Sequence, residues 1–239
     1  MSEKLYTIPV NEAFDIDCEC PFCQMRKSLE ENAIEFTMGP SYMEDDVRGV
    51  TSRMGFCEKH TKLLYLNQNR LGMAFILKSQ MDKIIKDIEK HAAINNRIIT
   101  PSFLKKKGDN SEIVTYLDKL EHSCYVCNMI EGTFERYMAT AFHLYHTDIG
   151  FREKFQNSKG FCTSHYKTLY SLSPKYLGGE ELKKFIHLLN TLYIENMKRV
   201  RDDLEWFIDK FDYRYADEPW KNAKDALPRA MQKTNSIVN

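Results

Sequence analysis

The chain has 239 residues, enough for one large domain or two small ones, and 43% of them are hydrophobic, so a hydrophobic core can form. Its 34 basic and 34 acidic residues give a formal charge of +0, which leaves no broad field to attract nucleic acid and disfavours nucleic-acid binding. No apolar run reaches the length of a transmembrane helix.

The N-terminal 19 residues contain one short apolar run, from Leu5 to Val10. Pro9 lies inside this run, so we predict an extended segment there and not a helix. The first residues lack the pattern of a signal peptide. This favours a reducing compartment, and we expect a cytoplasmic protein.

The first half of the chain then follows a helical pattern. Apolar residues recur at intervals of three and four from Cys20 until Gly39-Pro40, which predicts one helix. We expect a short helix over 43–53, a tight turn at Gly55, a helix after His60 and a long helix over 71–93. The apolar stripe of the long helix consists of Ala74, Leu77, Met81, Ile84, Ile85, Ile88 and Ala92.

The second half repeats this order after a polar break. We predict a linker over 99–110, a helix from Cys124, a short helix over 148–157 and a turn at Gly160. A helix after His165 should end at Ser173-Pro174, and one of about thirty residues should start near Glu180. The tail after Pro219 shows one weak amphipathic turn and ends in polar residues, so we expect its last residues to be disordered.

Two copies of one motif pair contain six of the seven cysteines. Each copy is Cys-x2-Cys followed by Gly-Phe-Cys-x2-His, with 33 or 34 residues between the second cysteine and the third. Three thiolates and one imidazole form the usual tetrahedral ligand set of structural zinc. We therefore predict two zinc ions per chain, one in each repeat. The predicted ligands are Cys20, Cys23, Cys57 and His60 in the first repeat and Cys124, Cys127, Cys162 and His165 in the second.

Three competing roles for the cysteines fit the pattern less well. Buried free cysteines would not explain why a histidine follows a cysteine by three positions in both copies. Disulfides do not fit a reducing compartment. An iron–sulfur cluster on the same ligands remains the less favoured alternative to zinc.

The alignment of the two halves indicates a duplication. Gly55, Cys57 and His60 match residues 105 positions later, and Cys20 and Cys23 match residues 104 positions later. These blocks resemble an uncharacterised bacterial family of duplicated cysteine-rich helical proteins, a resemblance that covers about residues 10–215. It implies metal ligands and a helical fold but no activity.

The predicted fold is all-α, with two related helical repeats, each carrying a metal site, packed through their long helices. The repeats should span 1–98 and 111–239. The second repeat departs from the first by having Tyr125 where Pro21 stands, which leaves the metal ligands intact.

One further pair lies just outside the motifs. In the alignment of the two halves, Cys18 matches His122 at the offset of 104 residues. Each lies two residues before the first predicted ligand of its repeat. Both are residue types that bind metals, so each could supply an additional ligand or contact a ligand. We favour the simpler interpretation, in which their position is incidental. If the pair has a role, we expect Cys18 close to the metal but not bonded to it, and His122 in the matching place.

Three function classes follow from these sites. A site with four protein ligands has no open position for water, which favours a non-catalytic zinc protein that presents a helical surface to a protein partner. The alternative is a thiol or metal-handling protein: a redox sensor, a zinc reservoir or an iron–sulfur protein. Nucleic-acid binding is the least favoured class. The sequence does not decide whether the protein is an enzyme, but it disfavours enzymatic activity. It also leaves open whether the chain forms a homo-oligomer.

Overall fold

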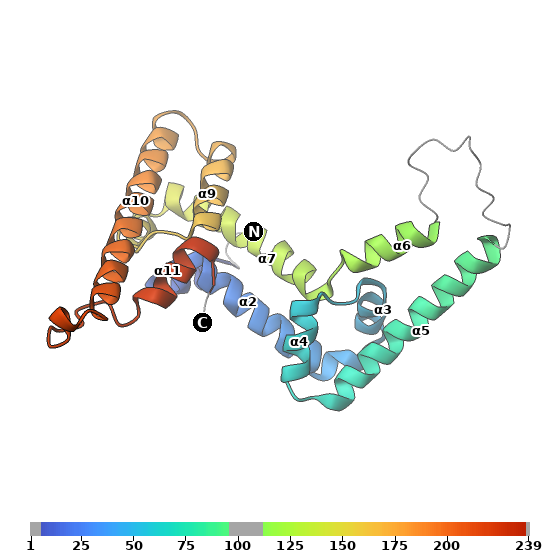
Figure 1. The fold of residues 1–239 in the computed structure, drawn as a ribbon. Helices are drawn as coiled ribbons and strands as arrows, with labels where there is room; N and C mark the ends of the chain where they lie inside the picture. The colour runs from blue at the N-terminus through green and yellow to red at the C-terminus, as the bar shows by residue number, and fades with distance from the viewer. Residues whose placement is uncertain (1–5, 96–111, 238–239) are drawn as a thin grey trace, which may run out of the picture. The chain divides into compact units, whose positions relative to one another are not determined.

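The structure is a computed structural model, and it describes residues 6–95 and 112–237. These residues form helices joined by turns and contain no strand, which confirms the all-α prediction (Figure 1). Within the described ranges, no helix is both long enough and apolar enough to cross a membrane. The elements are α1 (Thr7–Asp15), α2 (Pro21–Met38), η2 (Pro40–Met43), α3 (Asp45–Met54), α4 (Glu58–Leu66), α5 (Arg70–Asn95), α6 (Glu112–Glu121), α7 (Tyr125–Thr147), α8 (Ile149–Gln156), α9 (Thr163–Tyr176), α10 (Gly179–Asp209), η3 (Tyr213–Tyr215) and α11 (Ala226–Asn235).

The chain divides into two compact units that do not coincide with the two repeats. Unit one consists of Met1–Leu29 with Thr133–Asn239, and unit two is Glu30–Gly132. We predicted boundaries at 98 and 111, whereas the units divide within α2 and within α7. Each of these helices begins in one unit and ends in the other, so each unit combines elements of both repeats. The predicted linker at 99–110 lies outside the described residues.

Unit one has an aromatic core. Phe14 on α1 packs against Phe151 and Phe155 on α8, with ring centroids 4.8 and 5.7 Å apart. Phe155 also contacts Phe161 and Phe185, at 5.0 and 5.5 Å, which links α8 to the turn before α9 and to α10. Phe151, Phe155, Phe161 and Phe185 are all at most 1% exposed, so these rings fix the helices around the turn.

The extended segment that we predicted at the N-terminus is wrong, because Thr7–Asp15 forms α1. Pro9 is the third residue of this helix, where a backbone N–H would have no acceptor within the helix in any case. The helix also buries Val10 and Phe14 in the core of unit one. Packing therefore decides the conformation, and the proline costs little at that position.

The predicted helix end at Ser173-Pro174 is also wrong, because α9 continues to Tyr176. A proline inside a helix leaves the carbonyl four residues earlier without its N–H donor. That carbonyl belongs to Tyr170, and the hydroxyl of Ser173 donates to it at 3.0 Å. The serine thus replaces the missing hydrogen bond and allows the helix to pass the proline.

The tail after Pro219 has more structure than the single weak turn that we expected. It includes α11, which contacts both α9 and α10. Ala223 and Ala226 are fully buried, and Lys233 is 1% exposed. The small side chains let the segment approach its neighbours closely. Disorder of the last residues stays a prediction, because residues 238 and 239 lie outside the described ranges.

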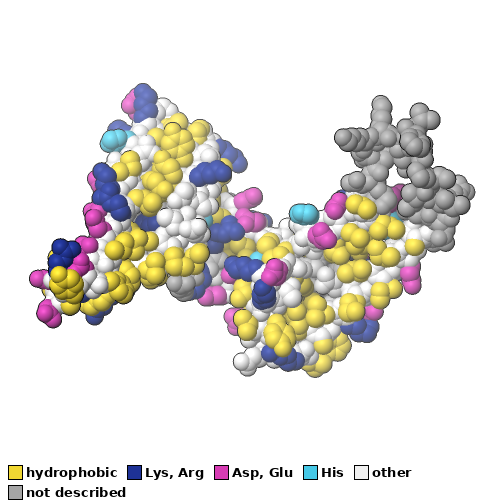
Figure 2. Space-filling model, in the orientation of Figure 1, with side chains coloured by type: hydrophobic (Ala, Val, Ile, Leu, Met, Phe, Trp, Pro, Cys, Tyr) yellow, Lys and Arg dark blue, Asp and Glu magenta, His cyan; other side chains and the backbone are white. Residues whose placement is uncertain are grey.

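Among the described residues, the main buried cluster of unit two is much smaller than that of unit one and consists of Met38, Leu64, Met73 and Ile76. The long helix α5 contacts α3 and α4, and its residues Met73 and Ile76 pack in this core with Met38 of α2 and Leu64 of α4. Its predicted apolar stripe lies on another face and remains largely exposed: Leu77 is 38%, Met81 61% and Ile85 53% exposed. On the face drawn in Figure 2, hydrophobic side chains gather over α5 and α6. The two long helices therefore pack in different units, α10 in the core of unit one and α5 in that of unit two.

Candidate metal centres

The eight predicted ligand residues converge in two groups of four. In each group, three sulfur atoms and one imidazole nitrogen lie within 4.8 Å of one another. Each group combines the Cys-x2-Cys of one repeat with the Cys-x2-His of the other. Centre A, in unit one, is Cys20, Cys23, Cys162 and His165, and centre B, in unit two, is Cys57, His60, Cys124 and Cys127.

The ligand atoms of centre A surround a common point. Nδ1 of His165 lies 3.4 Å from the sulfurs of Cys20 and Cys23 and 3.2 Å from that of Cys162. The sulfurs of Cys23 and Cys162 are 3.5 Å apart. A tetrahedral zinc ion, with bonds of about 2.3 Å to sulfur and 2.0–2.1 Å to nitrogen, separates two sulfurs by about 3.8 Å and a sulfur from a nitrogen by about 3.5 Å. The donor set therefore fits one ion of this kind.

Centre B has the same arrangement and one further contact. Nδ1 of His60 lies 3.2 Å from the sulfurs of Cys57 and Cys124 and 3.3 Å from that of Cys127. The sulfurs of Cys57 and Cys127 are 4.0 Å apart. Nε2 of His60 lies 2.9 Å from a carboxylate oxygen of Glu30, which fixes Nδ1 as the nitrogen that faces the sulfurs. Such a carboxylate is typical of a histidine that binds a metal.

Helix N-termini supply the ligands of both centres. Cys57 and Cys162 are the N-cap residues of α4 and α9. Cys20 and Cys124 directly precede α2 and α7. The free amides of a helix N-terminus favour negative charge, so this arrangement stabilises thiolates. Two such termini meet at each centre.

The turns that lead into α4 and α9 require glycine, as predicted. Gly55 and Gly160 have φ angles of 63° and 74°, which side-chain-bearing residues rarely adopt. A Cβ atom on Gly160 would also lie 2.9 Å from the carbonyl oxygen of Leu192, so the turn packs directly against α10. The glycines therefore bring Cys57 and Cys162, two residues later in each repeat, to the centres.

The three thiols of each centre share their protons unequally. Hydrogen bonds from Cys20 and Cys23, together with His165, hold the pKa of the Cys162 thiol far below its usual range, although burial opposes this. Burial raises the pKa of Cys124, but hydrogen bonds with His60 and with the backbone of Cys127 and Cys57 together outweigh burial and lower the pKa to about 6. At centre A, the same hydrogen bond that lowers the pKa of Cys162 raises the pKa of its partner Cys23 to about 12. A cation that binds all three sulfurs of a centre must therefore displace protons.

The pairing of motifs within each repeat, as we predicted it, is wrong. His60 contacts Glu30, and Glu30 lies on α2 two helical turns beyond Cys23. A metal ion reaches ligand atoms only about 2.3 Å away, so His60 and Cys23 cannot share one ion. Helix α2 separates the two motifs of the first repeat. The Cys-x2-Cys motif of each repeat therefore forms a centre with the Cys-x2-His motif of the other repeat.

The difference between Pro21 and Tyr125 has a structural consequence. In unit two, the N–H of Tyr125 donates to the carbonyl of Gly55 at 3.0 Å and ties together the two loops that carry ligands. Pro21, the matching residue of the other repeat, has no N–H to donate to Gly160. In unit one, Lys233 from α11 joins the corresponding loops, because its ammonium donates to the carbonyls of Glu19, at 2.7 Å, and Lys159.

Lys233 is embedded in a buried ionic cluster. Its ammonium lies 3.2 Å from the carboxylate of Glu19, which is 4% exposed and also contacts Arg199 at 2.5 Å. Burial lowers the pKa of Lys233, and the charge of Glu19 opposes this effect. No sequence pattern predicts this cluster or the contact of Glu30 with His60, because each contact joins residues far apart in the chain.

Replacing Lys233 by methionine is expected to lower the free energy of unfolding by about 3 kcal/mol, because two carbonyls and one carboxylate lose a buried partner while the aliphatic stem is kept. Denaturant unfolding followed by circular dichroism measures this change. Lys224→Met serves as the control, because Lys224 is exposed and precedes the same helix. Equal stabilities of the two variants would contradict the role assigned to Lys233.

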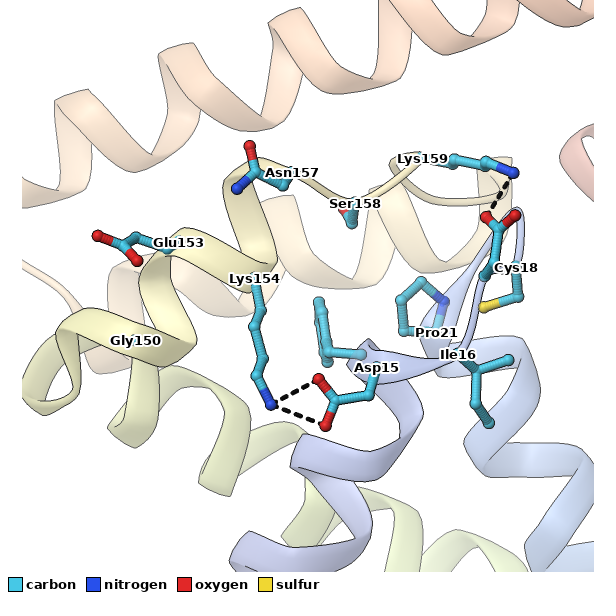
Figure 3. A pocket seen from close by; sticks show the side chains of 12 residues that line it. Asp15, Ile16, Cys18, Pro21, Gly150, Glu153, Lys154, Asn157, Ser158 and Lys159 are labelled. Atoms are coloured by element: carbon cyan, nitrogen blue, oxygen red, sulfur yellow. Dashed lines mark hydrogen bonds and ion pairs between the residues drawn. The ribbon is translucent and has the colours of Figure 1, made fainter.

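Cys18 and His122 do not join either group of converging ligand atoms. Cys18 is half-buried in a cleft between the α1–α2 loop and α8, beside ion pairs that link Lys154 to Asp15 and Lys159 to Asp17 (Figure 3). Burial raises the pKa of its thiol, and a hydrogen bond with the backbone of Cys20 opposes this. His122 is exposed, with Nδ1 2.7 Å from the carbonyl of Asp118. A role of either side chain at a bound metal stays a prediction.

The sequence profile of DUF6062, a family of unknown function, matches residues 1–239. This match confirms the resemblance to a cysteine-rich helical family that the motifs suggested. No curated protein and no solved structure matches the chain.

Proposed function

Since the chain belongs to DUF6062, whose function is unknown, we propose its role from the two centres: it is a non-catalytic zinc protein whose two Cys3His sites hold a helical interaction module together. The observation that carries this proposal is the convergence of three sulfurs and one Nδ1 at each centre, with spacings close to those around a tetrahedral ion.

The donor set favours zinc over an iron–sulfur cluster. An iron–sulfur cluster places several iron and sulfide atoms between its protein ligands. At centre A, however, the sulfurs of Cys23 and Cys162 are 3.5 Å apart and leave room for a single ion. Three thiolates with one imidazole suit zinc, which has no geometric preference of its own and accepts both ligand types.

The number of ligands favours a structural role over a catalytic one. Catalytic zinc keeps one coordination position for water or substrate, whereas four protein ligands fill a tetrahedral ion. The positions of the ligands in the chain agree with this role. Cys23 and Cys162 are 139 residues apart and Cys57 and Cys127 are 70 apart, so each ion closes a long loop.

The exposed stripe on α5 supports an interaction with another protein. Met81 and Ile85 are more than half exposed and lie one helical turn apart, with Leu77 one turn before them. An apolar stripe that the described residues of its own unit leave uncovered is typical of a surface that binds a partner. The chain's formal charge of +0 offers no attraction for nucleic acid.

Element analysis of protein purified without chelators tests the zinc assignment. We expect zinc as the main metal, at about two ions per chain, in a colourless protein. Brown protein with iron and acid-labile sulfide would favour the cluster, and metal-free protein would end the proposal. The interaction role is tested separately with Met81→Glu combined with Ile85→Glu, which should abolish co-purification of a partner and leave the zinc content unchanged.

A further inference from the structure

The two centres have the same ligands but differ in how they are covered. At centre A, all four ligand residues are buried, none more than 4% exposed. At centre B, His60 and Cys124 are buried, but Cys57 and Cys127 are only half-buried. Small solutes therefore reach two sulfurs of centre B more easily than any sulfur of centre A.

The C-terminal helix accounts for the cover of centre A. The side chain of Gln232 hydrogen-bonds the sulfur of Cys23, and the hydroxyl of Ser236 lies 3.1 Å from the sulfur of Cys162. Thr163, next to Cys162, donates to the carbonyl of Lys233 at 3.0 Å. These contacts place α11 and the residue that follows it directly over the ligand sulfurs of unit one.

The two half-buried sulfurs of centre B are neighbours. Cys57 and Cys127 come from the N-termini of different helices, α4 and α7, and their sulfurs are 4.0 Å apart. A disulfide requires an S–S distance of about 2.0 Å, so each sulfur has to move by about 1 Å, a shift that a small change in side-chain torsion provides. The pair is thus both accessible and close enough to be oxidised together.

We propose that Cys57 and Cys127 are a peroxide-sensitive pair, which forms a disulfide and thereby opens centre B while centre A stays intact. The inference rests on the zinc-binding function proposed above. It assigns different tasks to two sites with the same ligands: the covered centre A keeps its ion, and centre B responds to hydroperoxides.

The two thiolates supply the electrons of the reaction, and the peroxide accepts them. One thiolate attacks a peroxide oxygen, the O–O bond breaks, and a sulfenic acid forms as hydroxide leaves and takes up a proton from water. The second thiolate attacks this sulfur, the S–S bond forms, and the S–O bond breaks with loss of a second hydroxide. Two electrons pass from the sulfurs to the peroxide, which ends as two waters. Only Cys124 and His60 then remain as ligands of centre B.

Hydrogen peroxide titration of the full-length, zinc-loaded protein tests the proposal. Zinc release is followed with a chromogenic chelator, and disulfides are mapped by mass spectrometry after alkylation. We expect one ion per chain to leave at least about tenfold faster than the other, with the Cys57–Cys127 disulfide as the first product, because accessible thiolates are oxidised first. Dithiothreitol with zinc should restore the starting state.

Cys18→Ser is the matched control, because Cys18 is a half-buried thiol outside both centres. It should leave the rate of zinc release unchanged. Equal release from both centres, a first disulfide between Cys124 and Cys127, or a first disulfide in centre A would overturn the inference. The metal content before oxidation tests zinc binding itself, so two bound ions that leave together would contradict this inference and not the proposed function.

Discussion

Cys20→Ser combined with Cys162→Ser is expected to remove one metal ion per chain, whereas Cys20→Ser combined with Cys57→Ser removes both. Cys20 and Cys162 belong to the same centre, so the first pair of substitutions damages centre A twice and leaves centre B complete. Cys20 and Cys57 belong to different centres, so the second pair damages each centre once. Loss of one thiolate from a four-ligand site weakens zinc binding by orders of magnitude.

Native mass spectrometry of the two double variants measures this difference directly. The single variants Cys57→Ser and Cys162→Ser are the controls, and each should retain one ion. If ligands paired within each repeat, the two double variants would exchange their results, with one ion retained by the variant that carries Cys57→Ser. The comparison therefore tests the crossed pairing separately from the presence of metal.

The crossed pairing shows what a repeated motif can and cannot predict. The Cys-x2-Cys and Cys-x2-His spacings identified the eight residues, because three positions bring two ligand atoms to one point at the start of a helix. The partner of each half-motif depends on where α2 and α7 carry the chain. Both pairings satisfy the same spacing, so the sequence alone does not distinguish them.

The wrong predictions of secondary structure share one physical cause. Pro9 and Pro174 both argued against a continuous helix, but the first lies where no donor is needed and the second has a serine hydroxyl in place of its own N–H. The polar tail suggested little structure, but the buried ammonium of Lys233 has three acceptors, on Glu19 and Lys159, that lie far away in the sequence. In each case the packing or hydrogen bonds around one particular residue overrule the average propensity of its residue type.

Chelation of both ions is expected to lower the melting temperature by more than about 10 °C, because each site contributes several kcal/mol and about 1 kcal/mol corresponds to 2–4 °C for a chain of this size. The two units should respond differently. Unit one keeps an extensive aromatic core around Phe14, Phe155 and Phe185, whereas the core of unit two rests on a few residues around Leu64 and Ile76. Unit two depends more on its metal.

Hydrogen–deuterium exchange of metal-free protein resolves the two units. Amides of α3, α4 and α5 should lose most of their protection, while those of α8, α9 and α10 should keep much of theirs. Adding zinc back should restore both the melting temperature and the protection pattern, which excludes irreversible damage by the chelator. Unchanged melting after verified loss of both ions would show that neither centre stabilises the fold, and uniform loss of protection would show that the core of unit one is not sufficient without its metal.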